Sequence, residues 1–377
     1  MNNPDVQSSK IPASAVPTSA DGRLAWLRLA RSNRVGPSTF IRLVRAHDTA
    51  QAALEALPNV AAEAGARGYA PCSFAQAEAE IEAADAANAH MLCLGAANYP
   101  PHLALIPDPP PVLWAIGDPS LARCPTVGLV GARNASSIGL RMARQLAAEL
   151  GAAGYIVASG LARGVDTAAH QASLDTGTIA ALAGGVDTVY PRENLALWQS
   201  MAERGLLLSE APMGTSPQAR HFPRRNRIIS GVSLGIAVIE GAAKSGSLIT
   251  ARNALDQGRE VMAVPGSPLD PRASGCNMLL RDGAALIRSG ADIIECLASS
   301  VQPALPLQKS PHRQPPPASA QPANTPGIHT LLTTTPIAED ALIREIGLPT
   351  DKAMELIFGM ELAGEITRHP GGMLSRA

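Results

Sequence analysis

The sequence predicts an α/β protein with a doubly wound, mostly parallel sheet, a small helical domain before it and a winged-helix-like domain after it. Three observations predict this order. Short apolar runs alternate with helical stretches between about residues 112 and 299. Helical periodicity precedes these runs, and a Pro-rich segment separates them from a last unit of two helices and a hairpin. Near-continuous apolar strands that alternate with helices are typical of a parallel sheet covered on both faces.

The N-terminal region is predicted to be a short disordered segment followed by helices. Residues 1–21 are rich in Pro, Ser and Ala, which favours disorder. In residues 22–90, Trp26 lies in the first helical pattern, and the turn Gly36-Pro37-Ser38 starts a second. The Pro-rich segment 100–111 is expected to separate this helical domain from the sheet.

The apolar runs predict the strands of the central domain, residues 91–299. The expected strands are 126–130, 155–158, 178–182, 205–208, 234–239 and 259–264. Between the first two, 137–150 places Ile138, Met142 and Leu146 on one helical face. Ligands of open parallel sheets bind beyond the carboxyl ends of the strands, so the loops that follow these strands are the place to look for a site.

The C-terminal region is predicted to be a linker and a winged-helix-like domain. Residues 300–327 contain eight prolines and no acidic residue, as expected of an extended linker. In 328–377, one helix is expected to end at Gly347, another to begin at Thr350, and a hairpin to turn at Pro-Gly-Gly. This domain holds 4 basic and 7 acidic residues. Because a DNA-reading winged helix normally has a basic recognition helix, we expect a protein contact or a lost DNA role here.

Composition excludes several classes of protein. The 31 Lys+Arg and 32 Asp+Glu give a net charge of −1, so any nucleic-acid site must be local. Of the basic residues 27 are Arg and 4 are Lys, which fits either phosphate recognition or a GC-rich coding bias. The five cysteines show no CxxC pair, which favours free thiols, a cytoplasmic location and no metal site. No signal peptide or membrane-spanning apolar stretch is expected.

Four loops after the expected strands share a pattern of glycine with arginine, lysine or serine. They are 131–139, 159–166, 184–191 and 241–247. Glycine allows close approach, arginine offers a fork for phosphate and serine can cap a helix. There is no GxGxxG, and Lys244-Ser245 resembles the end of a Walker A loop without its glycines, so we expect no cofactor. Each loop alone is explained by a tight turn, whereas the four together favour a phosphate-binding edge.

The densest basic signal is a group of four arginines within eight residues, in an interval that has no acidic residue between Glu210 and Glu240. These arginines are Arg220, Arg224, Arg225 and Arg227. They either line a phosphate-rich surface, which we favour, or pair with carboxylates elsewhere in the fold. Phe222 lies among them and either stacks on a base or packs as a hydrophobic staple.

The candidate single-stranded DNA and phosphate site combines these loops and the arginine group. Its members are Gly131, Arg133, Ser137, Ser159, Gly160, Arg163, Gly164, Phe222, Arg224, Arg225, Asn226, Arg227, Lys244, Ser245 and Ser247. Asp166 and His170 lie at i, i+4 without a candidate nucleophile, so we expect structural support of the second loop rather than catalysis. Asp187 and Glu210 are either paired carboxylates or anchors for the arginines, and we favour anchors.

These motifs, in this order, resemble the DprA family of DNA-processing proteins, also called Smf. The resemblance rests on Val130-Gly131-Ala132-Arg133, Ser159 to Asp166 with His170, Gly184 to Pro191, Ser209-Glu210, Phe222 to Ile229, Ser245 to Ala251, Ala263 to Gly266 and Gly275-Cys276-Asn277. It covers the whole α/β domain. The N-terminal helices resemble the SAM-like domain of many members, and Pro370-Gly371-Gly372 lies where the family's winged helix turns.

The resemblance implies an extended Rossmann fold that binds single-stranded DNA in a basic pocket and forms homodimers. It further implies a recombination mediator of natural transformation and competence, which protects incoming DNA, loads RecA onto it and displaces single-strand-binding protein. Arg133 and the group from Arg224 to Arg227 occupy the positions that hold DNA phosphates in relatives. The resemblance does not imply an enzyme.

Two other classes remain open from the sequence. One is a Rossmann-type hydrolase that cleaves the glycosidic bond of nucleoside monophosphates, although its PGGxGTxxE motif is absent because Met373 follows Pro370-Gly371-Gly372. The other is a scaffold protein for which DNA contact is incidental.

Overall fold

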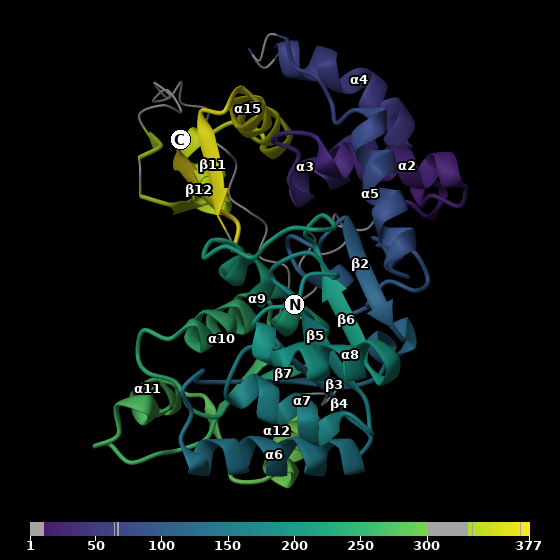
Figure 1. Ribbon diagram of the computed structural model, residues 1–377. Coiled ribbons are helices and arrows are strands. Elements are labelled where there is room, and N and C mark those ends of the chain that lie inside the picture. Colours follow the sequence, from purple (N-terminus) through teal and green to yellow (C-terminus); the bar gives the residue numbers. More distant parts are fainter. Residues whose placement is uncertain (1–10, 64, 66–67, 301–330, 334, 370) are drawn as a thin grey trace, which may run out of the picture.

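The computed structural model describes residues 11–63, 65, 68–300, 331–333, 335–369 and 371–377 (Figure 1). The predicted linker, apart from Ser300, and the first ten residues lie outside these ranges. The predicted disorder is wrong for residues 11–21. Ala13–Ala15 forms a 3-10 helix, η1, whose Ala15 is buried in the main core, and the Ser19 hydroxyl caps the first α-helix by accepting from the Gly22 amide.

The central sheet has nine strands in the order β1-β2-β6-β5-β4-β3-β7-β8-β9. Their bounds are β1 His90–Cys93, β2 Val112–Gly117, β3 Thr126–Val130, β4 Ile156–Ser159, β5 Thr178–Ala181, β6 Leu206–Ser209, β7 Gly235–Val238, β8 Glu260–Ala263 and β9 Ala285–Leu286. The strands from β3 to β9 run parallel, whereas β1 and β2 are antiparallel additions next to β6. The six predicted strands correspond to β3–β8, and the predicted mostly parallel α/β fold is confirmed.

Helices cover both faces of this sheet (Figure 1). Their bounds are α6 Ser137–Ala152, α7 Val165–Ser173, α8 Leu195–Arg204, α9 His221–Val232, α10 Gly246–Asp256, α11 Ser274–Arg281 and α12 Gly290–Ser300, with short 3-10 turns η2 Leu103–Leu105, η3 Pro119–Arg123, η4 Arg192–Asn194 and η5 Pro271–Ala273. Helices α6, α7 and α12 pack on one face, and α9, α10 and α11 on the other. The chain runs outward from β3 to β6 and returns to β7 beside β3, so the topological switch point lies between β3 and β7.

The N-terminal helical domain is locked onto the sheet by buried polar contacts. It consists of α2 Ala20–Arg31, α3 Pro37–His47, α4 Ala50–Glu63 and α5 Phe74–Ala86. The indole N–H of Trp26 donates to the carbonyl of Pro111 at 2.8 Å. Glu80 accepts from Arg31 at 2.7 Å and from the indole of Trp114, on β2, at 2.7 Å. The helical domain therefore has a defined position relative to the sheet.

The Pro-rich segment 100–111 is not the separator that the sequence suggests. It lies between β1 and β2, and thus within the sheet domain. Leu103 and Ile106 are buried, and η2 contacts α9. Apolar side chains between the prolines pull this segment into the core.

The C-terminal domain has the predicted winged-helix outline. It contains β10 Ile337–Ala338, α14 Glu339–Ile346, α15 Thr350–Ala363, β11 Ile366–His369 and β12 Met373–Arg376, with strand order β10-β12-β11. Gly347 ends α14 in the left-handed conformation, where glycine has no steric penalty. Its small core is formed by Leu342, Ile357, Leu374 and their neighbours.

The second helix of this motif, α15, packs against the N-terminal helical domain (Figure 1). Arg34 donates to the Leu362 carbonyl at the end of α15 at 2.6 Å. The Arg42 guanidinium lies 3.5 Å from the ring centroid of Phe358 and donates to the Met354 carbonyl at 3.1 Å. Burial lowers the pKa of Arg42 to about 10. Helix α15 of the acidic C-terminal domain thus makes a protein contact within its own chain.

Candidate nucleic-acid interface

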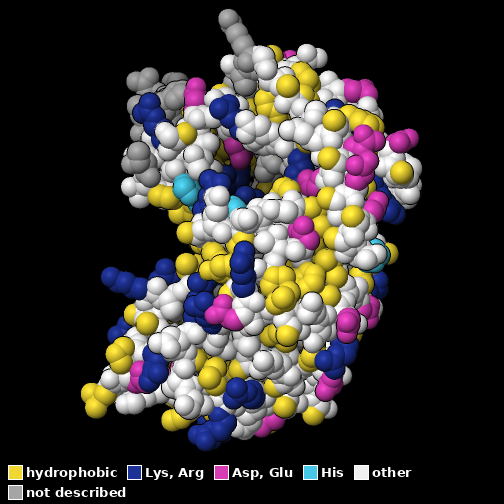
Figure 2. Space-filling model, viewed as in Figure 1, with side chains coloured by type: hydrophobic (Ala, Val, Ile, Leu, Met, Phe, Trp, Pro, Cys, Tyr) yellow, Lys and Arg dark blue, Asp and Glu magenta, His cyan; other side chains and the backbone are white. Residues whose placement is uncertain are grey.

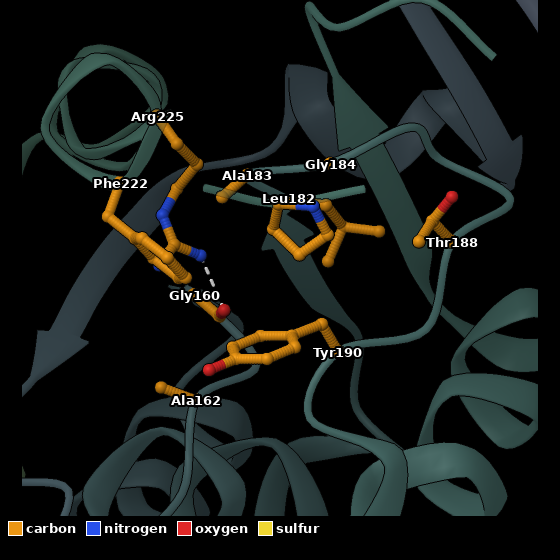
Figure 3. Close-up of a pocket in the computed structure, with 10 residues that line it drawn as sticks. Gly160, Ala162, Leu182, Ala183, Gly184, Thr188, Tyr190, Phe222 and Arg225 are labelled. Carbon is orange, nitrogen blue, oxygen red and sulfur yellow. Dashed lines mark hydrogen bonds between the residues drawn. The ribbon is translucent and has the colours of Figure 1, made fainter. Parts of the chain in front are cut away.

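The carboxyl edge of the sheet carries a small pocket with two aromatic rings, which we call the aromatic pocket (Figure 3). Its lining residues are Gly160, Ala162, Leu182, Ala183, Gly184, Thr188, Tyr190, Pro217, Phe222 and Arg225. The rings of Tyr190 and Phe222 are tilted by 58° with centroids 5.7 Å apart. Tyr190 is 46% exposed and Phe222 half-buried, so both rings can meet a ligand.

Two exposed arginines lie beside this pocket. The Arg133 guanidinium, from the loop after β3, lies 4.8 Å from the Phe222 ring centroid. Arg163, from the loop after β4, is exposed and pairs with Glu193 at 2.6 Å. Lys244, in the loop after β7, is also exposed. A guanidinium next to an aromatic ring suits a nucleic-acid strand, because the ring can stack on a base while the cation meets a phosphate.

Arg225 lines the pocket but is buried, with 6% of its surface exposed. Its Nη1 donates to the carbonyl of Gly160, just after β4 (Figure 3), and to that of Ala181, at the end of β5. Burial lowers its pKa to about 10, opposed by Asp166. These bonds correct the expectation that Arg225 is a freely reaching phosphate ligand, because two of its donors are held by the protein's own carbonyls.

Arg227 is an internal ion-pair residue rather than a phosphate ligand. Its side chain is 5% exposed, its Nη2 lies 2.7 Å from Glu210 and its Nε lies 3.3 Å from Asp108. The expectation of phosphate contact is therefore wrong for Arg227, since two carboxylates already neutralise it. Glu210 also lies 3.7 Å from the exposed Arg224, so this carboxylate anchors both arginines.

Three more predicted contact residues are buried. Asn226 accepts from Arg225 Nε at 3.3 Å and donates to the Gly246 carbonyl at 3.2 Å, which ties α9 to α10. Ser159 donates to the Leu129 carbonyl at 2.6 Å, and Ser247 lies 2.7 Å from the hydroxyl of Ser245. The structure corrects all three to structural roles. Their buried polar side chains, at a strand end and at helix starts, need hydrogen-bond partners within the protein. Ser245 is half-buried and Ser137 is exposed.

The loop after β4 is held from inside by two side chains of α7. Asp166 accepts from the amides of Gly160 at 3.1 Å and Ala162 at 3.3 Å, and His170 Nε2 accepts from the amide of Leu161 at 3.3 Å. Leu161 has φ of 53°, a left-handed conformation that is strained for leucine. These three hydrogen bonds hold the loop in this strained conformation, and the loop lines the pocket through Gly160 and Ala162.

The contacts of His170 define its tautomer. Thr178 donates its single hydroxyl proton to the Val157 carbonyl at 2.9 Å, so it accepts from His170 Nδ1, 2.7 Å away. Nε2 must then be the unprotonated acceptor for the Leu161 amide. Burial of the neutral ring lowers the pKa of His170 to about 3.

We expect His170 to make the protein less stable in mild acid. The unfolded histidine binds a proton near pH 6.5 and the folded one only near pH 3, so its contribution to stability is full above pH 6.5 and falls below it. Relative to His170→Gln, the wild type should lose about 2 kcal/mol of unfolding free energy between about pH 7 and about pH 5. Urea unfolding at the two pH values measures this, and equal losses in both proteins would contradict it.

The loop after β3 is hydrogen-bonded to a carboxylate, Glu240, that was not among the residues predicted from the sequence. Glu240, directly after β7, accepts from the Ser136 amide at 2.8 Å and from the Ser136 hydroxyl. A Cβ on Gly139 would lie 2.5 Å from the Glu240 carboxyl carbon. Glu240 therefore sits at the N-terminus of α6, the position where Rossmann-type folds bind a nucleotide phosphate. Its only sequence signal is an acidic residue at a strand end.

The glycines of these loops serve internal packing. Gly164 has φ of 77°, and a Cβ on Gly131 would lie 2.6 Å from the Val165 side chain. At the third loop, the Gly185 amide donates to the Thr215 carbonyl, and Asp187 accepts from the Gly214 amide at 2.9 Å. Because many of the loop amides have internal acceptors, the groups that this edge offers to a ligand are mainly side chains.

The fold is that of an α/β protein with exposed arginines and two aromatic rings at the carboxyl edge of its parallel sheet. The central residues 90–298 match the family model described as DNA recombination-mediator protein A. Residues 20–83 match the DprA-like N-terminal HHH domain, and residues 311–372 match the DprA winged helix domain. The chain therefore belongs to the DprA/Smf family of DNA-processing proteins.

Individual relatives agree with this assignment. Protein Smf of Escherichia coli (strain K12) is 37% identical over 292 residues, which cover 76% of this chain and 77% of the relative. DNA processing protein DprA of Bacillus subtilis (strain 168) is 49% identical over 201 residues, 52% of this chain and 68% of the relative. The solved structure of DprA from Streptococcus pneumoniae aligns with a TM-score of 0.60 at 31% identity, covering 74% of this chain and 98% of that chain.

A second solved structure is that of DNA processing protein A from Helicobacter pylori, described for its unique single-stranded DNA binding mode. It aligns with a TM-score of 0.52 at 29% identity and covers 56% of this chain and 96% of that chain. No described helix of the present protein is long and apolar enough to cross a membrane. Among the described residues, no group of three or more His, Cys, Asp or Glu side chains is arranged to hold a metal ion.

Proposed function

We propose that this protein binds single-stranded DNA at the aromatic pocket and carries out no reaction on it. The observation that carries the proposal is the Arg133 guanidinium 4.8 Å from the Phe222 ring centroid, beside the exposed ring of Tyr190. Unpaired bases expose faces that can stack on such rings, whereas the bases of a duplex are already stacked. The proposed contacts at this pocket are Arg133, Arg163, Tyr190, Phe222 and Lys244, supported from inside by Asp166, His170, Asp187, Glu210 and Arg225.

Family membership supports a cellular role for this binding. The relative from H. pylori is described for single-stranded DNA binding, and those from B. subtilis and S. pneumoniae are named DNA processing proteins. We infer that the protein acts in the cytoplasm as a homodimer during natural transformation. There it protects incoming strands, displaces single-strand-binding protein and loads RecA. The strand-binding site belongs to the domain of residues 91–299.

A titration of labelled oligonucleotides at rising salt tests the binding. We expect single strands to bind at least about tenfold more tightly than duplex of the same length, because the pocket requires an unstacked base. Affinity should fall roughly tenfold to a hundredfold between about 50 and about 200 mM salt, as phosphate contacts release counterions. Equal binding of both forms, or affinity that ignores salt, would overturn the proposal.

A further inference from the structure

A second concavity begins at the aromatic pocket and reaches the N-terminal helical domain; we call it the interdomain groove. It shares Leu182, Ala183 and Arg225 with the aromatic pocket. One wall is formed by the start of α9, and the opposite wall by the turn between α2 and α3. Figure 2 shows the molecule hollowed beside the N-terminal helices, with basic side chains at the border; none of the described winged-helix residues lines the groove.

We propose that the interdomain groove holds the continuation of the DNA strand whose bases stack on the rings of the aromatic pocket. The proposal rests on the proposed function and extends it to a second subsite that joins two domains. The three shared lining residues are its first support, because they place the groove next to the aromatic pocket, within reach of a strand bound there.

The charge of the groove is its second support. Arg224 lies on the groove and not on the aromatic pocket, and its side chain is 62% exposed. Its nearest carboxylate, Glu210, is 3.7 Å away and already pairs with Arg227 at 2.7 Å. Arg224 is therefore placed to contact a phosphate, because the charge of Glu210 is already neutralised by Arg227.

The apolar walls are the third support. Pro37 and the half-buried His221 line the groove, whereas the side chains of Val35 and Ile228, which also line it, are almost wholly buried. Burial, with Arg220 and Arg224, lowers the pKa of His221, so its ring is neutral at neutral pH. Apolar and imidazole surfaces accept the face of a base irrespective of its identity. The groove is thus matched to an unpaired strand, with phosphates at Arg224 and bases toward the walls.

Gly36 provides a selective test. It lines the groove, it has an ordinary φ of −80°, and a Cβ placed on it meets no atom within 4 Å. It is also the N-cap of α3, where an acidic side chain does not harm a helix. Gly36→Glu therefore adds a negative charge to the groove wall without a clash, Gly36→Gln controls for size, and Gly36→Lys reverses the charge.

The experiment compares a strand of about four nucleotides, enough for the aromatic pocket alone, with one of about sixteen. In the wild type the long strand should bind more tightly. Gly36→Glu and Arg224→Gln should weaken the long strand about threefold to tenfold and lower its salt slope by about 1, with the short strand unchanged. Gly36→Gln should resemble the wild type, and Gly36→Lys should strengthen long-strand binding.

Two results would overturn the interdomain groove while leaving the aromatic pocket in place. One is equal affinity of the wild type for short and long strands. The other is a Gly36→Glu variant that binds both lengths as the wild type does, or loses both equally. If the wild type binds neither length, the proposed function itself fails along with the groove.

Discussion

Replacing Arg227 by alanine is expected to lower the free energy of unfolding by about 3–5 kcal/mol, because it removes a buried cation and leaves two partly buried carboxylates without it. Arg227 lies 2.7 Å from Glu210 and 3.3 Å from Asp108, with 5% of its side chain exposed. Asp108 belongs to the Pro-rich segment, so the ion pair also holds that segment against α9. Urea unfolding followed by circular dichroism measures the loss.

Arg224→Ala is the matched control, since Arg224 lies near the same Glu210 carboxylate but is 62% exposed. Exposed pairs contribute little, so its cost should stay below about 1 kcal/mol. The two variants separate the roles of neighbouring arginines. If Arg227→Ala keeps wild-type stability and loses DNA affinity, Arg227 is a phosphate ligand and the structural assignment is wrong.

Replacing Phe222 by alanine is expected to weaken single-strand binding by about 1–3 kcal/mol, the usual range for removing one stacking ring. The ring lies between Tyr190 and the Arg133 guanidinium, so its loss also removes the surface that orients this cation. Equilibrium titration at fixed salt measures the change, and about 1.4 kcal/mol corresponds to a tenfold higher Kd.

Phe222→Trp keeps a stacking surface and should bind nearly as the wild type does. Urea unfolding of both variants shows whether the half-buried ring also supports the fold. Unchanged affinity of a stably folded Phe222→Ala variant would contradict DNA binding at the aromatic pocket.

The strands that could be predicted from the sequence are those whose pattern is local. Strands β3 to β8 are short apolar runs buried on both faces, so composition alone identifies them. The predicted winged helix rests on an equally local signal, the glycine that ends α14. Strands β1 and β2 escaped prediction because they pair antiparallel at the sheet edge, and a run of prolines lies between them.

The site could be predicted in position but not in the direction that each arginine faces. Sequence spacing places Arg225 and Arg227 in one basic group, whereas α9 turns both side chains inward. The partners that decide this, Asp108 and the carbonyls of Gly160 and Ala181, lie in other segments of the chain. A charge count over the local interval therefore overestimates the cations that face a ligand.

The same limit applies to the loop amides. The four glycine-containing loops predict a phosphate-binding edge, but Glu240, Asp166 and His170 already accept hydrogen bonds from several of the loop amides. Glu240 also fills the helix start that a mononucleotide phosphate would use. The occupied loop amides are consistent with a long strand held by side chains. Such a strand binds through stacking on aromatic rings and through guanidinium groups, and it does not require free backbone N–H groups.

The most direct measurement locates the bound strand. A single-stranded oligonucleotide with one photoreactive halogenated pyrimidine is irradiated on the full-length protein, and the adduct is mapped by mass spectrometry. We expect adducts on Tyr190 or Phe222 that disappear when unlabelled single strand competes. Adducts confined to α14, α15 or the β11–β12 hairpin would contradict it.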